Sequence, residues 1–569
     1  MADNTAILRR RIDQALGREP ADLVIKNTRY LNVIDGNMVK GDIAVTGDTI
    51  VGVQADYHGA KEIDGRGKVV VPGFIDTHVH VESTCVSPWE FDRVVLPRGT
   101  TTAICDPHEI CNVLGTKGLD YFFAASANLG LDLRVQLSSC VPASHLETSG
   151  AVITAADLAP YKDHPRGIGL AEFMNYPGLL NKEAGVLEKL STFFGGHIDG
   201  HVPMVSGRDL NAYCACGIKN CHESTTLAEA AEKLSKGMQV LIRDGSLCKD
   251  VVTLSPLIND LTSPFLAFCT DDRNPLDIVE EGHLDHLIRT SIAAGAPLGA
   301  VYRAASWSAA QGFGLRDRGL IAPGYRADMV LLDDLADCAV VAVIRDGALV
   351  DEATFASHRP DLSVGRNSIR LDPVEPSIFE VPAPGPGGPV IGLVPNGVIT
   401  THLTMDLPHA NGLRHPDPGN DVLKVVVLNR HGGKRNIGRG FIKGFGFRDA
   451  AIASSVGHDA HNVIVIGNND GDMAVAVNRL IGMEGGFAVA KGGKILADLP
   501  LPIAGLMSDR PAGEVVTKLR NLRAAAKGIG CPLAEPFLHM AFLPLCVIPH
   551  LKITDHGLVD VDKFALIAA

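Results

Sequence analysis

The sequence contains few aromatic side chains and less positive than negative charge. Phe, Trp and Tyr make up 5% of the 569 residues, and the formal net charge is −13. A surface that binds a phosphate backbone needs clustered Lys and Arg side chains. The balance of charge therefore argues against a nucleic-acid-binding protein.

Long apolar runs are also missing. No stretch of about 18 apolar residues occurs, so the sequence predicts no membrane span. Residues 1–25 are polar and have the pattern of an amphipathic helix, without the apolar core of a signal peptide. Several of the 12 Cys lie in apolar segments (Cys105, Cys140, Cys269), which is more typical of buried thiols than of a disulfide framework. We expect a cytoplasmic protein with no membrane partner.

Three catalytic signatures are absent. His145 and Glu147 form the H-x-E of the cytidine-deaminase type of zinc enzyme, but no P-C-x-x-C follows them. Neither G-x-S-x-G nor a Walker A motif occurs, so serine hydrolases and P-loop NTPases lack support.

The chain is long enough for two or three domains, and its first part has a β-rich texture. Residues 21–70 alternate short apolar segments with the turn dipeptides Asp35-Gly36 and Gly47-Asp48, a pattern typical of hairpins. A similar texture returns at residues 322–350. We predict one small β-sandwich domain built from residues 1–71 and 322–375, with the middle of the chain inserted into it.

The middle region, residues 72–321, alternates apolar runs that end in polar residues with helix-like segments such as 226–237. This repetition over about 250 residues predicts a (β/α)₈ TIM-like barrel within the α/β class. A doubly wound sheet is the alternative. The eight runs are VVVPGFIDTHVH, TTAICDPHE, RVQLSSCVP, GIGLAEFMN, HIDGHVP, KNCHES, MQVLIRDGS and FLAFCTDDRNP.

A Pro/Gly-rich stretch, EVPAPGPGGPV, lies near the start of a third region, residues 376–569. This region contains strand-like runs such as VLKVVVLNR and HNVIVIG, and one clear helix near residues 471–486. We predict a separate C-terminal α/β domain.

Six side chains at the ends of these runs have metal-ligand chemistry. Residues i and i+2 of a strand point to the same side, so His78 and His80 can both face the barrel axis at its C-terminal mouth. Imidazole and carboxylate ligands suit Zn²⁺, Mn²⁺ or Fe²⁺ and exclude the thiolate class of structural zinc site. The sequence therefore predicts a site for two divalent ions. Its ligands are His78, His80, Glu172, His201, His222 and Asp271.

The motifs that carry these residues resemble those of the amidohydrolase superfamily, and within it those of the bacterial adenine deaminases. The barrel motifs are VPGFIDTHVHVEST, CDPHEI, AEFMN, DGHVP, GIKNCHES, IRDGS and CTDDR. The C-terminal motifs are GFIKGFGFRDAAIASSVGHDAHNVIVIGNND, NRLIGMEGGFAVA and LPLPIAGLMSD. The resemblance covers nearly the whole chain, and many superfamily members have a carboxylated Lys where this chain has Glu172.

The resemblance implies hydrolytic deamination of adenine to hypoxanthine and ammonia, in purine salvage or catabolism. A hydroxide that bridges two divalent ions, most often Mn²⁺ or Fe²⁺ with Zn²⁺ possible, would attack C6 of the purine. Glu172 would bridge the ions, and Asp271 would act as general base and then as general acid. We expect a homodimer for a chain of this build, and the resemblance implies adenine as its small-molecule partner.

Substrate contacts are less well specified by the sequence. The second run end places Asp106, His108 and Glu109 at the same mouth, where they contact the purine or only shape a turn through Pro107. Arg243 is a further candidate. The motif HDAHN, residues 458–462, either lines the pocket or holds a turn.

Two other functions are compatible with the pattern. The same metal chemistry could act on another 6-aminopurine or on a cyclic amide. The second alternative is a non-catalytic interaction protein, built on a barrel that has lost its metal ligands. All six ligands are present here, which argues against it.

Overall fold

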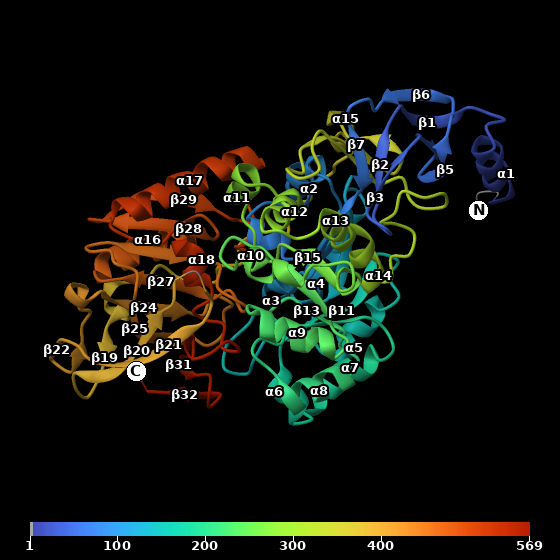
Figure 1. Ribbon diagram of the computed structural model, residues 1–569. Coiled ribbons are helices and arrows are strands. Elements are labelled where there is room, and N and C mark those ends of the chain that lie inside the picture. Colours follow the sequence, from blue (N-terminus) through green and yellow to red (C-terminus); the bar gives the residue numbers. More distant parts are fainter. Residues whose placement is uncertain (1–3, 396, 569) are drawn as a thin grey trace.

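The computed structural model describes residues 4–395 and 397–568, which form a small β domain, a central barrel and a C-terminal domain (Figure 1). Helix α1 (Asn4–Ala15) confirms the predicted N-terminal helix, whose first three residues lie outside the described residues. Within the described ranges, no helix is both long enough and apolar enough to span a membrane.

The small β domain consists of two sheets that pack against each other. The first has the order β5-β4-β1-β6 and the second the order β18-β17-β16-β7-β2-β3. Strands β7 and β16 pair although the barrel separates them in the chain, which confirms that one domain is built from both sides of the barrel. The strands are β1 (Ala21–Lys26), β2 (Arg29–Asn32), β3 (Asn37–Lys40), β4 (Asp42–Thr46), β5 (Thr49–Ala55), β6 (Gly59–Asp64), β7 (Val69–Pro72), β16 (Met329–Leu332), β17 (Val340–Arg345) and β18 (Ala348–Leu349).

Both predicted hairpins are present in this domain. Strands β2 and β3 pair in antiparallel fashion around the Asp35-Gly36 turn, and β4 and β5 around Gly47-Asp48. Gly36 and Gly47 have positive φ angles of 76° and 56°, which glycine adopts without a steric penalty. The domain boundaries proposed from the sequence stay a prediction.

The barrel contains the eight predicted strands, and each predicted run overlaps one of them. Neighbouring strands are parallel and follow chain order, so the barrel prediction is confirmed over the doubly wound sheet. The strands are β8 (Phe74–Val79), β9 (Thr100–Cys105), β10 (Asp132–Leu137), β11 (Gly167–Phe173), β12 (Ile198–Gly200), β13 (Asn220–Cys221), β14 (Gln239–Arg243) and β15 (Leu266–Cys269).

The barrel closes between its first and last strands. The Asp271 amide donates to the His78 carbonyl at 3.0 Å, and the His80 amide donates to the Asp271 carbonyl at 3.3 Å. Between β12 and β13, the Gly200 amide donates to the Asn220 side chain at 2.9 Å. The seam that closes the barrel is thus formed by residues that were predicted as metal ligands.

The C-terminal domain is built on a sheet with the order β21-β20-β25-β24-β27-β26-β28-β29. Helix α16 (Asp470–Gly482) confirms the predicted helix and packs with the sheet residues Val426 and Val465. The strands are β20 (Gly387–Leu393), β21 (Thr400–Asp406), β24 (Val422–Leu428), β25 (Ile437–Lys443), β26 (Ala451–Ser454), β27 (Val463–Gly467), β28 (Gly486–Lys491) and β29 (Lys494–Pro500).

The sequence pattern indicated one helix in this domain, but the structure also has the longer α17 (Ala512–Gly528). Its buried residues Val515, Leu519, Leu522 and Ala526 follow helical spacing. This helix lies beside α11 (Pro275–Glu280) of the barrel, where Arg523 Nη2 is 2.8 Å from Asp277 Oδ1. The helix therefore joins the domain to the barrel as well as to its own sheet.

A buried ion cluster holds the N-terminal end of the barrel. Asp132, at the start of β10, accepts from Arg134 Nη2 at 2.9 Å, from Arg166 Nη1 at 3.2 Å and from Arg318. Arg318 also donates to Thr102 on β9 at 3.0 Å. Burial alone would raise the Asp132 pKa, but the Arg318 and Arg134 cations outweigh it and hold that pKa below its usual range. The cluster ties two barrel strands to the segment that leaves the barrel.

We expect Arg318→Met to destabilise the protein by about 3–5 kcal/mol at pH 7, because it leaves the Asp132 carboxylate buried without its closest cation. A pKa lowered by folding stabilises the protein above the ordinary carboxyl pKa, and this contribution is lost as the pH falls. The deficit should therefore shrink in acid. Urea unfolding measures it. The matched change Arg316→Met, at an exposed position, should stay within about 0.5 kcal/mol; equal losses in both variants would contradict the role of the cluster.

Candidate metal centre and active site

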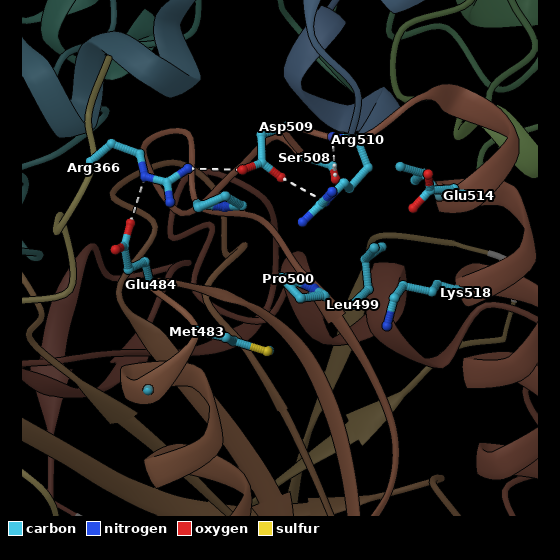
Figure 2. A pocket seen from close by; sticks show the side chains of 13 residues that line it. Arg366, Met483, Glu484, Leu499, Pro500, Ser508, Asp509, Arg510, Glu514 and Lys518 are labelled. Atoms are coloured by element: carbon cyan, nitrogen blue, oxygen red, sulfur yellow. Dashed lines mark hydrogen bonds and ion pairs between the residues drawn. The ribbon is translucent and has the colours of Figure 1, made fainter. Parts of the chain in front are cut away.

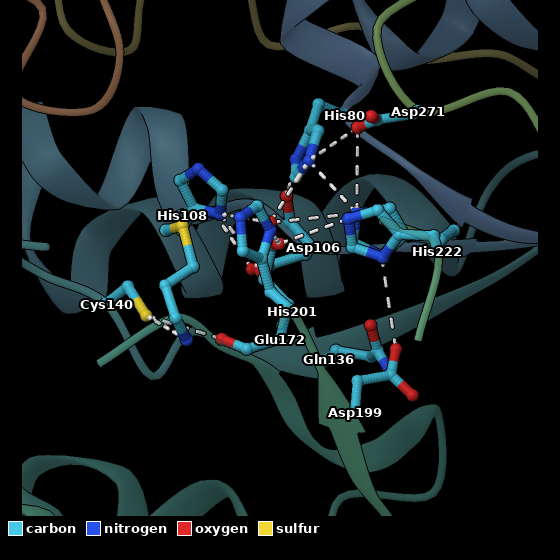
Figure 3. Close-up of polar contacts among 12 residues, drawn as sticks. His80, Asp106, His108, Gln136, Cys140, Glu172, Asp199, His201, His222 and Asp271 are labelled. Carbon is cyan, nitrogen blue, oxygen red and sulfur yellow. Dashed lines mark hydrogen bonds and ion pairs between the residues drawn. The ribbon is translucent and has the colours of Figure 1, made fainter. Parts of the chain in front are cut away.

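The six predicted ligands meet at the C-terminal mouth of the barrel. Figure 3 labels five of them, His80, Glu172, His201, His222 and Asp271. His78 lies near the end of β8 and His80 follows it, and their Nε2 atoms are 3.1 Å apart. His201 and His222 follow β12 and β13, and Asp271 follows β15 by two residues. All six side chains are buried.

Glu172, on β11, lies at the centre of the cluster. Its Oε1 is 3.3 Å from His80 Nε2 and 3.6 Å from His78 Nε2. Its Oε2 is 2.5 Å from His201 Nδ1 and 3.3 Å from His222 Nε2. Each carboxylate oxygen thus faces a different pair of imidazoles, which is the arrangement of a bridging ligand.

The donor set fits two divalent ions. Glu172 belongs both to a group with His78 and His80 and to a group with His201 and His222, and within each group the ligand atoms lie within 4.8 Å of one another. Asp271 Oδ1 adds a further oxygen 3.2 Å from His80 Nε2. Imidazole and carboxylate ligands of this kind suit Zn²⁺, Mn²⁺ and Fe²⁺ alike.

The surroundings of the Glu172 and Asp271 carboxylates favour their ionised forms. Burial would raise the pKa of Glu172, but His201 and the neighbouring imidazoles hold it well below its usual range. Burial likewise opposes ionisation of Asp271, and His80 and Arg243 reverse that effect on its pKa. Metal ligands must be deprotonated, so this charge distribution favours cation binding.

Arg243, at the end of β14, orients Asp271. Its Nη1 donates to Asp271 Oδ2 at 2.9 Å, and its Nε donates to Asp250 Oδ2 at 3.1 Å. It also binds Glu223, which directly follows the ligand His222. Glu223 and Asp250 were not among the predicted site residues, and the only signal for Glu223 was its position beside a ligand in CHES.

Three predicted substrate residues come from the turn after β9. His108 lies against the cluster, with Nδ1 3.0 Å from Asp106 Oδ2 and 3.4 Å from Glu172 Oε1. Asp106 also accepts from Ser138 at 3.0 Å, so its carboxylate fixes the His108 ring. Glu109 points away from the metal ligands towards the C-terminal domain, 3.1 Å from His458 Nδ1.

Polar groups contact the Nδ1 atoms of two ligand imidazoles and hold the rings in place. His80 Nδ1 is 3.0 Å from the Asp106 carbonyl, and since a carbonyl only accepts, the ring donates there and leaves Nε2 free for a cation. His78 Nδ1 is 3.9 Å from Asp199 Oδ2, and Asp199 is itself held by Gln136 at 2.5 Å (Figure 3). Partners of this kind orient metal ligands and tune their basicity.

A cavity lies over the cluster. His108 and Arg243 line it together with five of the ligands, whereas Asp106 and Glu109 lie behind it. The wall opposite the ligands is formed mainly by the C-terminal domain. Of this wall, the sequence predicted only the residues of the HDAHN motif. That wall consists of Val398, His458, Asp459, Phe542, Leu545 and Ile548, with Met174 from the barrel.

The HDAHN motif lines the cavity, which is one of the two roles considered from the sequence. His458 and Asp459 line the cavity, while Asn462 Nδ2 donates to the Thr148 carbonyl of a barrel loop at 2.8 Å. His461 Nε2 lies 3.2 Å from Glu109 Oε2. The motif thus joins the C-terminal domain to the barrel beside the site.

A larger cavity lies elsewhere, in the C-terminal domain (Figure 2). Its cations already have carboxylate partners, since Arg366 is 2.8 Å from Glu484 and 3.0 Å from Asp509, and Lys518 is 3.0 Å from Asp498. We place the chemistry in the smaller cavity, where buried polar atoms converge.

Two family models match the chain. The amidohydrolase family matches residues 69–350, and the adenine deaminase C-terminal domain matches residues 397–565. The adenine deaminase of Methylobacterium nodulans is 58% identical over 563 residues, which cover 99% of this chain and 100% of the relative. That of Gluconobacter oxydans is 56% identical over 559 residues, covering 98% and 99%.

Glu172→Gln tests the bridging position. We expect the purified variant to keep its fold but to bind divalent metal at least about 100-fold more weakly, because the amide removes the charge that both ligand groups share. Equilibrium dialysis with metal analysis measures this. The matched change at the exposed Glu188, Glu188→Gln, should leave the metal content unchanged; a metal content in Glu172→Gln equal to that of the unmodified protein would exclude Glu172 as a ligand.

Proposed function

Because the chain belongs to the adenine deaminase family of the amidohydrolases, we propose that its buried ligand cluster and the side chains around it deaminate adenine. The reaction adds one water to C6 of adenine and releases hypoxanthine and one ammonia. One observation carries this proposal: a single cavity is lined by residues from both regions that match the family models.

His78, His80 and Asp271 would hold one divalent ion and His201 and His222 a second, with Glu172 shared between them. When bound, such a pair lowers the pKa of a water molecule and supplies a hydroxide nucleophile at neutral pH. We propose Mn²⁺ or Fe²⁺ as the native ions, with Zn²⁺ as the alternative that this donor set also accepts.

Asp271 moves the protons in this proposal. Arg243 holds its Oδ2 at 2.9 Å, so that Oδ1 is left to face the ligand cluster and the substrate. Asp271 takes a proton from the attacking water and delivers it to the departing amine, as general base and then general acid. Arg243 thus acts through Asp271.

The remaining side chains position the purine. His108 lines the cavity beside Glu172, with its ring fixed by Asp106, and we propose that it contacts the purine ring. Met174, Phe542, Leu545 and Ile548 supply apolar walls for a flat heterocycle and exclude water from the reacting centre. Glu109 holds the wall that the C-terminal domain contributes.

We also propose that the protein acts as a cytoplasmic homodimer. Large apolar side chains such as Phe194 and Leu261 are exposed, at 76% and 86%, on the single chain. Sedimentation velocity measures the oligomeric state directly.

The substrate is tested by incubating the Mn²⁺- or Fe²⁺-loaded protein with adenine, adenosine and other 6-aminopurines and measuring ammonia. We expect release from adenine. Release from another 6-aminopurine or a cyclic amide, with none from adenine, would keep the mechanism and change the substrate.

Asp271→Asn should retain metal but lower kcat by about 10²- to 10⁴-fold, because the amide cannot accept and return the proton. Metal analysis and ammonia release on the same preparation separate the two effects. The exposed Asp163 gives the matched control, and Asp163→Asn should turn over normally. Normal turnover by Asp271→Asn would refute the proton-transfer role.

A further inference from the structure

The cavity wall from the C-terminal domain contains a buried carboxylate without a hydrogen-bond donor. Asp459 is 1% exposed, and its Oδ2 has no hydrogen-bond partner among the described residues. Its Oδ1 is 3.7 Å from His108 Nε2 and 3.8 Å from His458 Nδ1, beyond ordinary hydrogen-bond lengths. A buried carboxylate oxygen in this position is unfavourable unless something else supplies a donor.

His108 places this carboxylate relative to the metal ligands. Its Nδ1 lies 3.4 Å from Glu172 Oε1, while its Nε2 faces Asp459 and has no hydrogen-bond partner in the described chain. Asp459 and Glu172 therefore lie on opposite sides of one imidazole ring. The cavity has a reacting end at the ligands and a second polar end at Asp459.

The position of Asp459 is fixed by its neighbours in the HDAHN motif. His458 Nδ1 lies 3.1 Å from Glu109 Oε1, and His461 Nε2 lies 3.2 Å from Glu109 Oε2. Both contacts join the motif to the barrel turn that also carries His108. The carboxylate is thus held at a set place before any substrate arrives, as a recognition group requires.

The surroundings specify what kind of donor can reach Asp459. Phe542 stacks on His458 with ring centroids 4.5 Å apart and planes 9° from parallel, and Leu545 and Ile548 continue the apolar wall. The donor must therefore sit on the edge of a flat, mostly apolar molecule. When C6 of adenine faces the ligands, the far edge of the purine carries N3 and N9, and N9 of the free base bears a hydrogen.

We propose that Asp459 accepts a hydrogen bond from the imidazole N–H of the free purine base, and thereby selects adenine against 6-aminopurines substituted at N9. This inference rests on the proposed deamination of adenine. A nucleoside has no hydrogen at N9, so it leaves the carboxylate without a donor and puts a sugar against the C-terminal wall. A site built around a buried polar group rejects a ligand that lacks the matching group by large factors.

The test compares adenine with 9-methyladenine, which lacks only the N–H, on the metal-loaded protein. We expect the unmodified protein to favour adenine by at least about 100-fold, with 9-methyladenine measured as a substrate or as a competitive inhibitor. Asp459→Asn should lower kcat/KM for adenine by about 10- to 100-fold, mainly through KM. The constant for 9-methyladenine should change by less than about threefold, since that ligand offers Asp459 no donor.

The exposed Asp449 provides a matched control in the same domain, and Asp449→Asn should leave both constants unchanged. If Asp459 had only a structural role, Asp459→Asn would impair the constants for adenine and for 9-methyladenine together. That result would overturn the proposal. Equal use of adenine and 9-methyladenine by the unmodified protein would also overturn it.

Two further measurements keep the outcomes distinct. The side chains of His108, His458 and Asp459 could also hold a cation, since their ligand atoms lie within 4.8 Å of one another; loss of one metal equivalent in Asp459→Asn would assign them to an ion and refute purine recognition. If no ammonia comes from adenine, the proposed function fails, and calorimetric titration with adenine and 9-methyladenine still tests Asp459. Equal binding of both would then reject its role.

Discussion

The carboxylate of Glu172, buried among four imidazoles, is the interaction on which the rest of the site depends. It comes from β11, while the imidazoles come from β8 and from the residues that follow β12 and β13. Burial penalises its charge, so the imidazoles must lie within a few ångströms to keep it ionised. Only a barrel that closes in one register can bring these strand ends together, and the hydrogen bonds that close it connect His78, His80 and Asp271 themselves. The register in which the barrel closes therefore also determines the geometry of the ligands.

The same closure explains why so many buried polar groups surround the ligands. Asp106 fixes His108 through its side chain and His80 through its carbonyl, and Arg243 fixes Asp271. Each of these groups would be costly to bury alone, but Asp106 is paired with His108 and Asp271 with Arg243. The rigidity that results keeps the donor atoms at distances a cation can use.

The sequence was sufficient for the barrel and for the grouping of the six candidate ligands at its mouth, because both depend on local periodicity and on where strands end. The sequence could not predict the roles of neighbouring residues whose side chains point in different directions. Asp106, His108 and Glu109 share one turn, yet one orients a ring, one lines the cavity and one binds the other domain, since Pro107 and the start of α3 (His108–Leu114) turn each side chain in a different direction. The apolar wall of Phe542, Leu545 and Ile548 was missed because its position over the cluster depends on contacts with residues far away in the chain. Helix α17 was missed although its buried residues follow helical spacing.

The C-terminal domain belongs to the catalytic unit in energetic as well as chemical terms. Glu109 is buried in the barrel, and its charge is compensated by His458 and His461 of the other domain. The hydrophobic core is also continuous across the junction, because Val86 and Phe91 of the barrel share one cluster with Met507 and Leu519. A barrel without this domain would expose that core and leave the Glu109 carboxylate without its imidazole partners. The ligand cluster provides chemistry that a barrel of this kind can apply to many substrates, whereas the wall over it comes from a domain that the barrel needs in order to be stable. Stability and substrate recognition thus depend on the same interface.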